Sequence, residues 1–162
     1  MIQVADRLWI GSQSDYERDV RLSSRPWGVI HACKEPYHRL FVGYGGRGCP
    51  KDNPEYLYAV RGRRVALNLI DGDDPEFVPM EAVDFALRVI GRWSEDLPML
   101  LHCNRGESRS AVIGMLWLAS HGRFPGMDFE AAEAEFRRMY PPYNPARGMR
   151  LFAMQKWEKY AK

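Results

Sequence analysis

The chain has 162 residues, of which 46% are hydrophobic and 27% charged, and its formal net charge is +2. This length predicts a single domain over residues 1–162, and no apolar run is long enough to span a membrane. The net charge is too small to indicate nucleic-acid binding by itself. Because three cysteines cannot pair evenly and residues 1–6 lack a signal-peptide pattern, we expect a reducing, cytoplasmic environment.

The first part of the chain predicts two strands around a short helix. An apolar run at residues 7–11 indicates an entry strand, and residues 27–33 indicate a second strand that ends at Cys33. Between them, Ser14 is suited to cap a helix that continues to Val20.

Residues 35–64 are punctuated by glycine and proline, which predicts an irregular segment with one added strand at residues 56–58. The segment is also basic. A solvated loop is the favoured interpretation of these charges, and a border around an anion-binding pocket is the alternative. The basic residues concerned are Arg39, Arg47, Lys51, Arg61, Arg63 and Arg64.

Beyond this segment, strands alternate with helices. Strands are expected at residues 65–70 and 98–101 because both runs are apolar. Helices are expected at residues 79–93 and 108–120, where apolar residues recur at three- and four-residue spacing and predict one buried face. Gly122 is placed to end the second of these helices.

Two more helices are expected towards the end of the chain. Asp128 is suited to cap the first of them, which ends at Tyr140 before two prolines. The last helix carries Met149, Phe152 and Trp157 on one face. Aromatic side chains in such helices are expected to pack in the core.

The most informative stretch runs from His102 to Ser110, between the last strand and the helix that follows it. In a tight loop that enters a helix, backbone N–H groups point into one concavity and bind anions such as a phosphoryl group. Gly106 lies where the backbone needs a conformation closed to side chains, or approaches the ligand closely. Arg109 supplies a planar, two-pronged donor for two phosphate oxygens.

The chemistry expected of this stretch is nucleophilic attack by sulfur. Positive charge and helix-end donors beside Cys103 favour its thiolate, which would attack phosphorus and form a phosphocysteine that water hydrolyses. Ser110 can donate a hydrogen bond to the leaving sulfur, His102 supports the loop, and no metal or cofactor is required. The residues expected to enclose the phosphate are Asn104, Arg105, Gly106, Glu107, Ser108 and Arg109.

The pattern H-C-x-x-G-x-x-R-S at residues 102–110 resembles the signature of the cysteine-dependent protein tyrosine phosphatase superfamily, and the short chain is similar to its dual-specificity branch. The resemblance implies an α/β fold with a central, largely parallel sheet flanked by helices on both faces. It also implies an aspartate that acts as general acid and then as general base. Asp71, directly after the strand at residues 65–70, matches best, and Asp73 and Asp74 are alternatives.

The resemblance also bears on a second thiol. In some relatives a cysteine similar to Cys33 protects the nucleophile through a reversible disulfide, and a buried packing residue is the alternative interpretation. Cys49 lies in the irregular segment and has no expected role.

The sequence specifies the substrate that bears the phosphoryl group less strongly than it specifies the loop. One arginine and one glutamate at variable loop positions carry less positive charge than the lysine-rich loops of phosphoinositide-hydrolysing relatives, which favours a phosphorylated protein substrate. Phosphotyrosine is expected to be accepted, with phosphoserine and phosphothreonine alongside it.

The alternative functions are an RNA 5'-triphosphatase, a phosphoinositide phosphatase and a non-catalytic phosphate-binding module. A metal-binding protein is disfavoured because no paired Cys-x-x-Cys spacing is present, and a sulfurtransferase because its loop is shorter.

Overall fold

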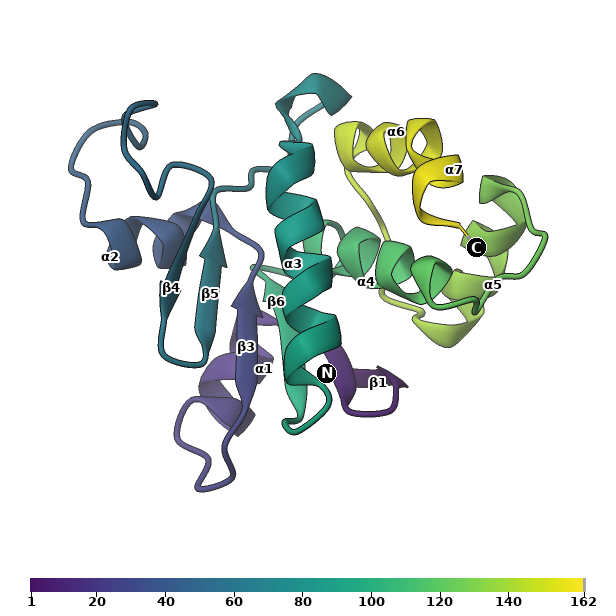
Figure 1. Cartoon of the computed structure of the whole chain (residues 1–162), viewed down its shortest axis with the longest axis horizontal. Helices are drawn as coiled ribbons and strands as arrows, with labels where there is room; N and C mark the ends of the chain where they lie inside the picture. Colours follow the sequence, from purple (N-terminus) through teal and green to yellow (C-terminus); the bar gives the residue numbers. More distant parts are fainter. Residues whose placement is uncertain (162) are drawn as a thin grey trace.

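A computed structural model describes residues 1–161, which build one six-stranded sheet and its covering helices (Figure 1). The strands are β1 (Ile2–Ala5), β2 (Leu8–Ser12), β3 (Gly28–His31), β4 (Tyr58–Arg61), β5 (Arg64–Leu67) and β6 (Met99–Cys103). They lie in the order β1-β2-β6-β3-β5-β4 across the sheet. The four inner strands are parallel, and each edge strand pairs antiparallel with its neighbour.

Helices cover both faces of the sheet, which confirms the expected fold class. They are α1 (Gln13–Asp15), η1 (Tyr16–Val20), η2 (Lys34–His38), α2 (Arg39–Val42), η3 (Pro75–Phe77), α3 (Met80–Trp93), α4 (Arg109–Ser120), α5 (Phe129–Met139), α6 (Arg147–Gln155) and α7 (Trp157–Tyr160). Neighbouring residues of a strand point to opposite faces. In β6, Leu101 lies against Gly114 of α4, whereas His102 stacks on Tyr16 of η1, so these helices cover opposite faces. Within residues 1–161, no helix is both long enough and apolar enough to cross a membrane.

The helix α4 is buried all round, whereas the sequence pattern predicts a single buried face. Every residue from Arg109 to Ala119 is buried. The helix lies between strands β2 and β6 and the helices α3, α6 and α7. Gly114 permits this close packing, because a side chain there would collide with Ile10. Such an enclosed helix holds its first residues, and the loop before them, in a fixed position.

The start of the chain differs from the prediction in two respects. The strand β1 was not predicted, and it pairs with β2 through Ile2 opposite Ile10. The helix α1 is capped by Ser12 rather than by Ser14, because β2 runs directly into the helix. The Ser12 hydroxyl accepts a hydrogen bond from the Asp15 N–H at 3.2 Å, and Asp15 Oδ2 accepts one from the Ser12 N–H at 2.8 Å. This capping box fixes the turn between β2 and α1.

The ends of several strands and helices also differ from the predicted ones. The added strand β4 begins at Tyr58, where the predicted strand ended, and β5 stops at Leu67 instead of residue 70. The Leu69 N–H donates to the Leu67 carbonyl at 2.9 Å, so the chain leaves the strand ladder there. The last predicted helix is divided at Lys156 into α6 and α7.

Candidate active site

The predicted strand–loop–helix connection is confirmed. Cys103 is the last residue of β6 and Arg109 is the first residue of α4. We call residues 103–108 the cysteine loop. It lies at the carboxyl ends of the parallel strands β2, β6 and β3, the edge at which ligands bind in open α/β sheets.

Gly106 is required in the cysteine loop for two reasons. Its φ of +78° lies in the left-handed region that side chains disfavour. A Cβ atom at this position would also lie only 2.7 Å from the Gly11 carbonyl oxygen at the end of β2. On the other side, the Tyr140 hydroxyl donates a hydrogen bond to the Gly106 carbonyl at 2.8 Å. The loop is therefore held by its backbone.

A hollow of about 270 Å³ opens over the cysteine loop. It brings together the predicted nucleophile, the predicted phosphate-binding arginine and one of the candidate aspartates. Its lining residues are Asp71, Cys103, Asn104, Arg105, Glu107, Ser108, Arg109, Asn144 and Ala146. Their side chains include two arginines and two carboxylates, so positive and negative charges are balanced around the hollow.

The sulfur of Cys103 is buried at the floor of this hollow. Ser110, in the first turn of α4, donates a hydrogen bond from Oγ to the Cys103 Sγ at 3.2 Å. Ser110 is itself fully buried, which fixes its hydroxyl beside the sulfur. This donor is placed to stabilise negative charge on the sulfur.

Arg109 is buried and is directed to the hollow by three contacts. Its Nη1 donates to the Leu69 carbonyl at 3.2 Å and its Nη2 donates to the Asn104 Oδ1 at 2.7 Å. Its Nε lies 3.0 Å from the Asp71 Oδ2, an ion pair whose geometry is not that of a hydrogen bond. The guanidinium plane is thus oriented before any anion meets it.

Asp71 is the candidate aspartate that the structure brings to Cys103. We call residues 71–74 the aspartate loop. The Ser108 Oγ donates a hydrogen bond to the Asp71 Oδ1 at 2.6 Å, and the Ser108 Oγ in turn accepts one from the Ala146 N–H at 3.0 Å. The Asp71 side chain remains 34% exposed. It is therefore anchored above the cysteine loop while staying open to the hollow.

The two alternative aspartates point elsewhere. The Asp74 carboxylate caps η3 by accepting a hydrogen bond from the Glu76 N–H at 2.9 Å. Asp73 is exposed, and its carbonyl accepts a hydrogen bond from Arg147 at 3.4 Å. Neither residue lines the hollow.

Two of the side chains expected to enclose the phosphate line the hollow and also support the loop. Asn104 Nδ2 donates to the Gln13 Oε1 at 3.1 Å and to the Glu35 carbonyl at 2.9 Å, which ties the loop to α1 and η2. Arg105 forms an ion pair with Glu107 at 3.1 Å within the loop itself. The positive charge of Arg105 is therefore already balanced.

The basic residues of the segment 35–64 do not border the hollow. Arg61 and Arg64 flank the turn at the amino end of β5, the end opposite to the cysteine loop. Within residues 1–161, no cluster of three or more His, Cys, Asp or Glu side chains is arranged to hold a metal ion.

No family model and no curated protein matches this sequence, so the similarity to known proteins lies in the structure. The crystal structure of human DUSP28 matches with a TM-score of 0.64 at 16% identity, covering 98% of this chain and 92% of that chain. The Yvh1 phosphatase domain from Chaetomium thermophilum matches with a TM-score of 0.63 at 15% identity, covering 98% of this chain and 94% of that chain. The chain has the fold of the dual-specificity phosphatases.

The similarity extends to a phosphatase-like protein. The human tyrosine phosphatase-like serine/threonine/tyrosine-interacting protein matches with a TM-score of 0.60 at 16% identity, covering 97% of this chain and 94% of that chain. All three dual-specificity-like structures thus span nearly the whole chain, which includes both the cysteine loop and the aspartate loop. At sequence identities of 15% to 16%, the similarity to these structures shows a shared fold.

Behind the cysteine loop, this dual-specificity phosphatase fold contains two buried histidines. The His102 Nε2 and the His31 Nδ1 lie 2.6 Å apart, and the His102 ring stacks on Tyr16. Burial lowers the pKa of His102 to about 4 and the pKa of His31 well below its usual value. Both rings are therefore neutral at pH 7. Their position fits support of the loop rather than proton transfer at the hollow.

Cys33 lies two residues beyond the end of β3 and is fully buried. All three cysteines, Cys33, Cys49 and Cys103, are free thiols. Burial raises the pKa of Cys33 to about 12, which disfavours the thiolate that disulfide exchange needs. A packing role is the interpretation that this environment supports.

Sequence reasoning missed the residues of the last third of the chain that complete the hollow and support its loops. Asn144 and Ala146 line the hollow, and Tyr140 supports Gly106. Gly148 lies against the aspartate loop, where its N–H donates to the Gly72 carbonyl at 2.9 Å and a Cβ would lie 2.5 Å from that oxygen. No local pattern in the sequence marks these contacts, because they join residues far apart in the chain.

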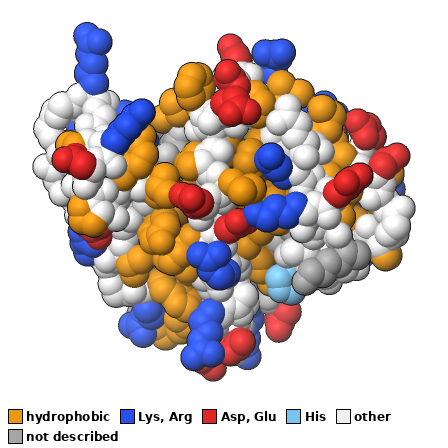
Figure 2. Space-filling view, turned by 45° about the horizontal axis from the view of Figure 1, so that its top comes forward, with side chains coloured by type: hydrophobic (Ala, Val, Ile, Leu, Met, Phe, Trp, Pro, Cys, Tyr) orange, Lys and Arg blue, Asp and Glu red, His pale blue; other side chains and the backbone are white. Residues whose placement is uncertain are grey.

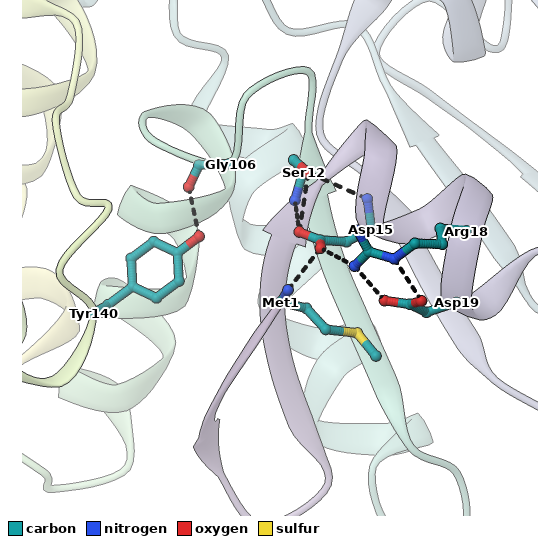
Figure 3. Close-up of polar contacts among 7 residues, drawn as sticks. All are labelled: Met1, Ser12, Asp15, Arg18, Asp19, Gly106 and Tyr140. Atoms are coloured by element: carbon teal, nitrogen blue, oxygen red, sulfur yellow. Dashed lines mark hydrogen bonds and ion pairs between the residues drawn. The ribbon is translucent and has the colours of Figure 1, made fainter.

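A charge cluster around Asp15 fixes the turn against which Gly106 packs (Figure 3). Asp15 Oδ1 lies 2.8 Å from the Met1 amine and 3.0 Å from the Arg18 Nη2. Burial alone would raise the pKa of Asp15, but hydrogen bonds from the amine and from Ser12 outweigh it and hold the pKa at about 2. The carboxylate is therefore charged throughout the pH range in which the protein would act.

Proposed function

We propose that this chain is a metal-independent protein phosphatase that hydrolyses phosphate monoesters through a phosphocysteine. The observation that carries the proposal is a single hollow lined by Cys103, Arg109 and Asp71, with Ser110 donating a hydrogen bond to the sulfur. These side chains supply a nucleophile, a phosphate ligand and a proton donor. Because the nucleophile is a thiolate, hydrolysis needs no metal-activated water.

In the first step, the Cys103 thiolate attacks phosphorus in line with the ester oxygen. Arg109 binds two phosphoryl oxygens through its planar guanidinium. Asp71 gives its proton to the departing oxygen as the phosphorus–oxygen bond breaks and the phosphorus–sulfur bond forms.

In the second step, water attacks the phosphocysteine. Asp71, now a carboxylate, takes a proton from this water and returns to its acid form. The phosphorus–sulfur bond breaks and inorganic phosphate is released. The departing Cys103 thiolate is stabilised by the hydrogen bond from Ser110, whose oxygen lies 3.2 Å from the sulfur.

The charge balance of the hollow supports a phosphoprotein as the substrate. Arg105 and Arg109 are offset by Glu107 and Asp71, so the lining suits one phosphoryl group better than a polyphosphate or a multiply phosphorylated inositol. An RNA 5'-triphosphate would need further cations, and the basic residues of the segment 35–64 lie outside the lining.

The lining also supports dual specificity. Among residues 1–161, the side chains that line the hollow include no aromatic ring that would deepen it for phosphotyrosine alone. Phosphotyrosine, phosphoserine and phosphothreonine are therefore all substrates in this proposal. The free thiol that the reaction requires places the activity in a reducing compartment such as the cytoplasm.

A Cys33–Cys103 disulfide that protects the nucleophile stays a prediction of the family resemblance. Peroxide would oxidise the Cys103 thiolate to a sulfenic acid, and the Cys33 sulfur would then displace the hydroxyl as water. Mass spectrometry after mild peroxide treatment tests this step. Absence of a Cys33–Cys103 cross-link would leave Cys33 with its packing role alone.

Hydrolysis of an activated aryl phosphate in the presence of EDTA, at pH 5 to 8, tests the proposed function. Wild-type protein should turn over, and Cys103→Ser should lose turnover while it retains phosphate binding. Turnover that disappears with EDTA, or that survives in Cys103→Ser, would contradict the thiolate mechanism. A phosphopeptide that binds reduced wild-type protein without being hydrolysed would instead identify a non-catalytic binding module.

A further inference from the structure

A second hollow, of about 320 Å³, lies beside the one over the cysteine loop. Its walls are largely apolar, with Leu57, Ile70, Phe77 and Pro79 among them. This composition contrasts with the charged lining around Cys103. We call this second hollow the apolar subsite.

The apolar subsite adjoins the proposed catalytic residues directly. Ile70 immediately precedes Asp71 in the chain. The Leu69 carbonyl forms part of the partition, because it accepts hydrogen bonds from Arg109 Nη1 at 3.2 Å on one side and from the Lys34 N–H at 2.9 Å on the other. A substrate seated on the cysteine loop therefore has the apolar subsite next to it.

The side chains of the apolar subsite are unusually exposed for their type. Phe77 is 67% exposed and Ile70 is 48% exposed, and both lie on the chain that carries the aspartate loop. The Phe77 ring leans towards that loop, since a Cβ on Gly72 would lie 3.9 Å from it. Figure 2 looks obliquely onto the side towards which the parallel strands point, and it shows hydrophobic side chains in groups between single charged ones. Grouped apolar exposure of this kind marks a binding surface.

Two charged residues of opposite sign, Lys34 and Glu76, belong to the lining of the subsite. The Lys34 Nζ donates one of its three hydrogens to the Arg47 carbonyl at 2.6 Å and keeps its positive charge. Glu76 also lines the hollow and is exposed. The charges of Lys34 and Glu76 oppose each other, so selection at the subsite depends on its apolar walls, where an uncharged apolar side chain would contact Leu57 and Phe77.

We infer that the apolar subsite binds an apolar side chain of the phosphorylated protein, located within about two residues of the phosphorylated residue. This inference rests on the proposed function and names the substrate class for it. An extended peptide advances about 3.3 Å per residue, so a residue one or two positions away reaches a neighbouring hollow. The subsite thus favours leucine-like side chains and disfavours charged ones such as glutamate, which would lose hydration against its apolar walls.

Phosphotyrosine peptides that differ only at the positions flanking the phosphotyrosine test this inference. Leucine, alanine or glutamate is placed at each of the two positions before and after it. Binding is measured by calorimetry with Cys103→Ser, which does not turn over, and kcat/KM is measured with the wild type. We expect leucine to be favoured over alanine by roughly tenfold at one position, and glutamate to be disfavoured there.

The variant Phe77→Ala should reduce the leucine preference to about twofold or less, because it removes the largest exposed wall of the subsite. Its kcat/KM for a small aryl phosphate should stay at the wild-type value, since Phe77 does not line the hollow around Cys103. Leu22→Ala is the matched control. Leu22 is 87% exposed and lies before β3, at the amino end of that strand.

The outcomes separate the inference from the proposed function. Aryl phosphate turnover combined with equal binding and equal kcat/KM for all the peptides would overturn the inference alone. Loss of the leucine preference in Leu22→Ala to the same degree as in Phe77→Ala would also overturn it. A protein that hydrolyses nothing would overturn the proposed function, and the peptide preference in the binding measurement would still decide whether the apolar subsite exists.

Discussion

The cysteine loop and the aspartate loop meet at one hollow, but they are held there differently. Buried contacts fix the cysteine loop from behind: Tyr140 supports the Gly106 carbonyl, and the enclosed helix α4 fixes Arg109. The aspartate loop is exposed, and Asp71 is placed by side chains of the motif, Ser108 and Arg109. The proposed nucleophile is therefore preorganised, whereas the position of the proposed acid depends on its contacts with the loop below it.

Asp71→Asn should distinguish the contributions of the two loops to catalysis most strongly. For esters with poor leaving groups, kcat/KM should fall about 10²- to 10⁴-fold, because the departing oxygen loses its proton donor. For an activated aryl phosphate the loss in the first step should be small, and phosphate affinity should be retained. The measurement is kcat/KM for a series of leaving groups. Asp73→Asn is the matched control, and an equal loss in that variant would refute the assignment of Asp71.

Gly106→Ala tests how rigidly the cysteine loop must be held. The position has a positive φ, which alanine disfavours, and the new Cβ would collide with the Gly11 carbonyl. The loop must therefore shift. A displacement of about 1 Å at the reacting groups costs about 10²-fold in rate. Gly122→Ala is the control, because Gly122 also has a positive φ but no atom lies within 4 Å of its added Cβ.

Steady-state kinetics and thermal unfolding should be measured for both glycine variants. Gly122→Ala should lower Tm slightly and leave kcat/KM unchanged. If Gly106→Ala kept wild-type kcat/KM, the close approach of Gly106 to the end of β2 would not be needed for activity.

The histidines behind the cysteine loop predict a dependence of stability on pH. Burial lowers the pKa of His102 to about 4 in the folded protein, from its usual value of 6.5. Between these values the unfolded chain binds more protons, so the free energy of unfolding falls as the pH drops from 6.5 towards 4. Between pH 7 and 5 the loss from His102 should be about 2 kcal/mol.

Urea unfolding at several pH values measures this dependence. His102→Gln should unfold with a smaller pH slope in this window, whereas His121→Gln, whose ring is at the surface, should keep the wild-type slope. Identical slopes for wild type and His102→Gln would mean that His102 is not held neutral by burial.

Ser108→Ala should have the smallest effect of the set and should act mainly through the position of Asp71. It removes the hydrogen bond to Asp71 at 2.6 Å and the one from the Ala146 N–H at 3.0 Å, but leaves the backbone of the cysteine loop in place. We expect about a tenfold loss of kcat/KM for poor leaving groups, corresponding to a hydrogen bond of roughly 1.4 kcal/mol. Phosphate inhibition constants should not change. A large loss of phosphate affinity would show that Ser108 holds the cysteine loop as well.

The same contrast explains what the sequence predicts and what it does not. The cysteine loop is a local structure, since an apolar strand, a glycine and an apolar helix define it within residues 98–120. Its placement is confirmed. Ser12 illustrates a local feature that was misread, because the helix begins directly where β2 ends and leaves Ser14 inside it.

The supports of the site come from distant parts of the chain. Tyr140 and Gly148 contact the loops across 34 and 76 residues of sequence, and no local pattern marks such a contact. The prediction that α4 buries one face also fails for this reason, because helices far along the chain cover its other faces. Local pattern therefore predicts the elements, and the tertiary packing around them determines how the acid is placed.

The most direct test of the account is to locate the phosphoryl group during turnover. Wild type, Asp71→Asn and Cys103→Ser are mixed with an activated aryl phosphate, quenched with acid and analysed by peptide mass spectrometry. The account predicts a phosphoryl adduct on Cys103 that accumulates more in Asp71→Asn, because the attacking water lacks its base, and that is absent in Cys103→Ser. Wild-type turnover with no adduct on Cys103, or with an adduct on another residue, would contradict it.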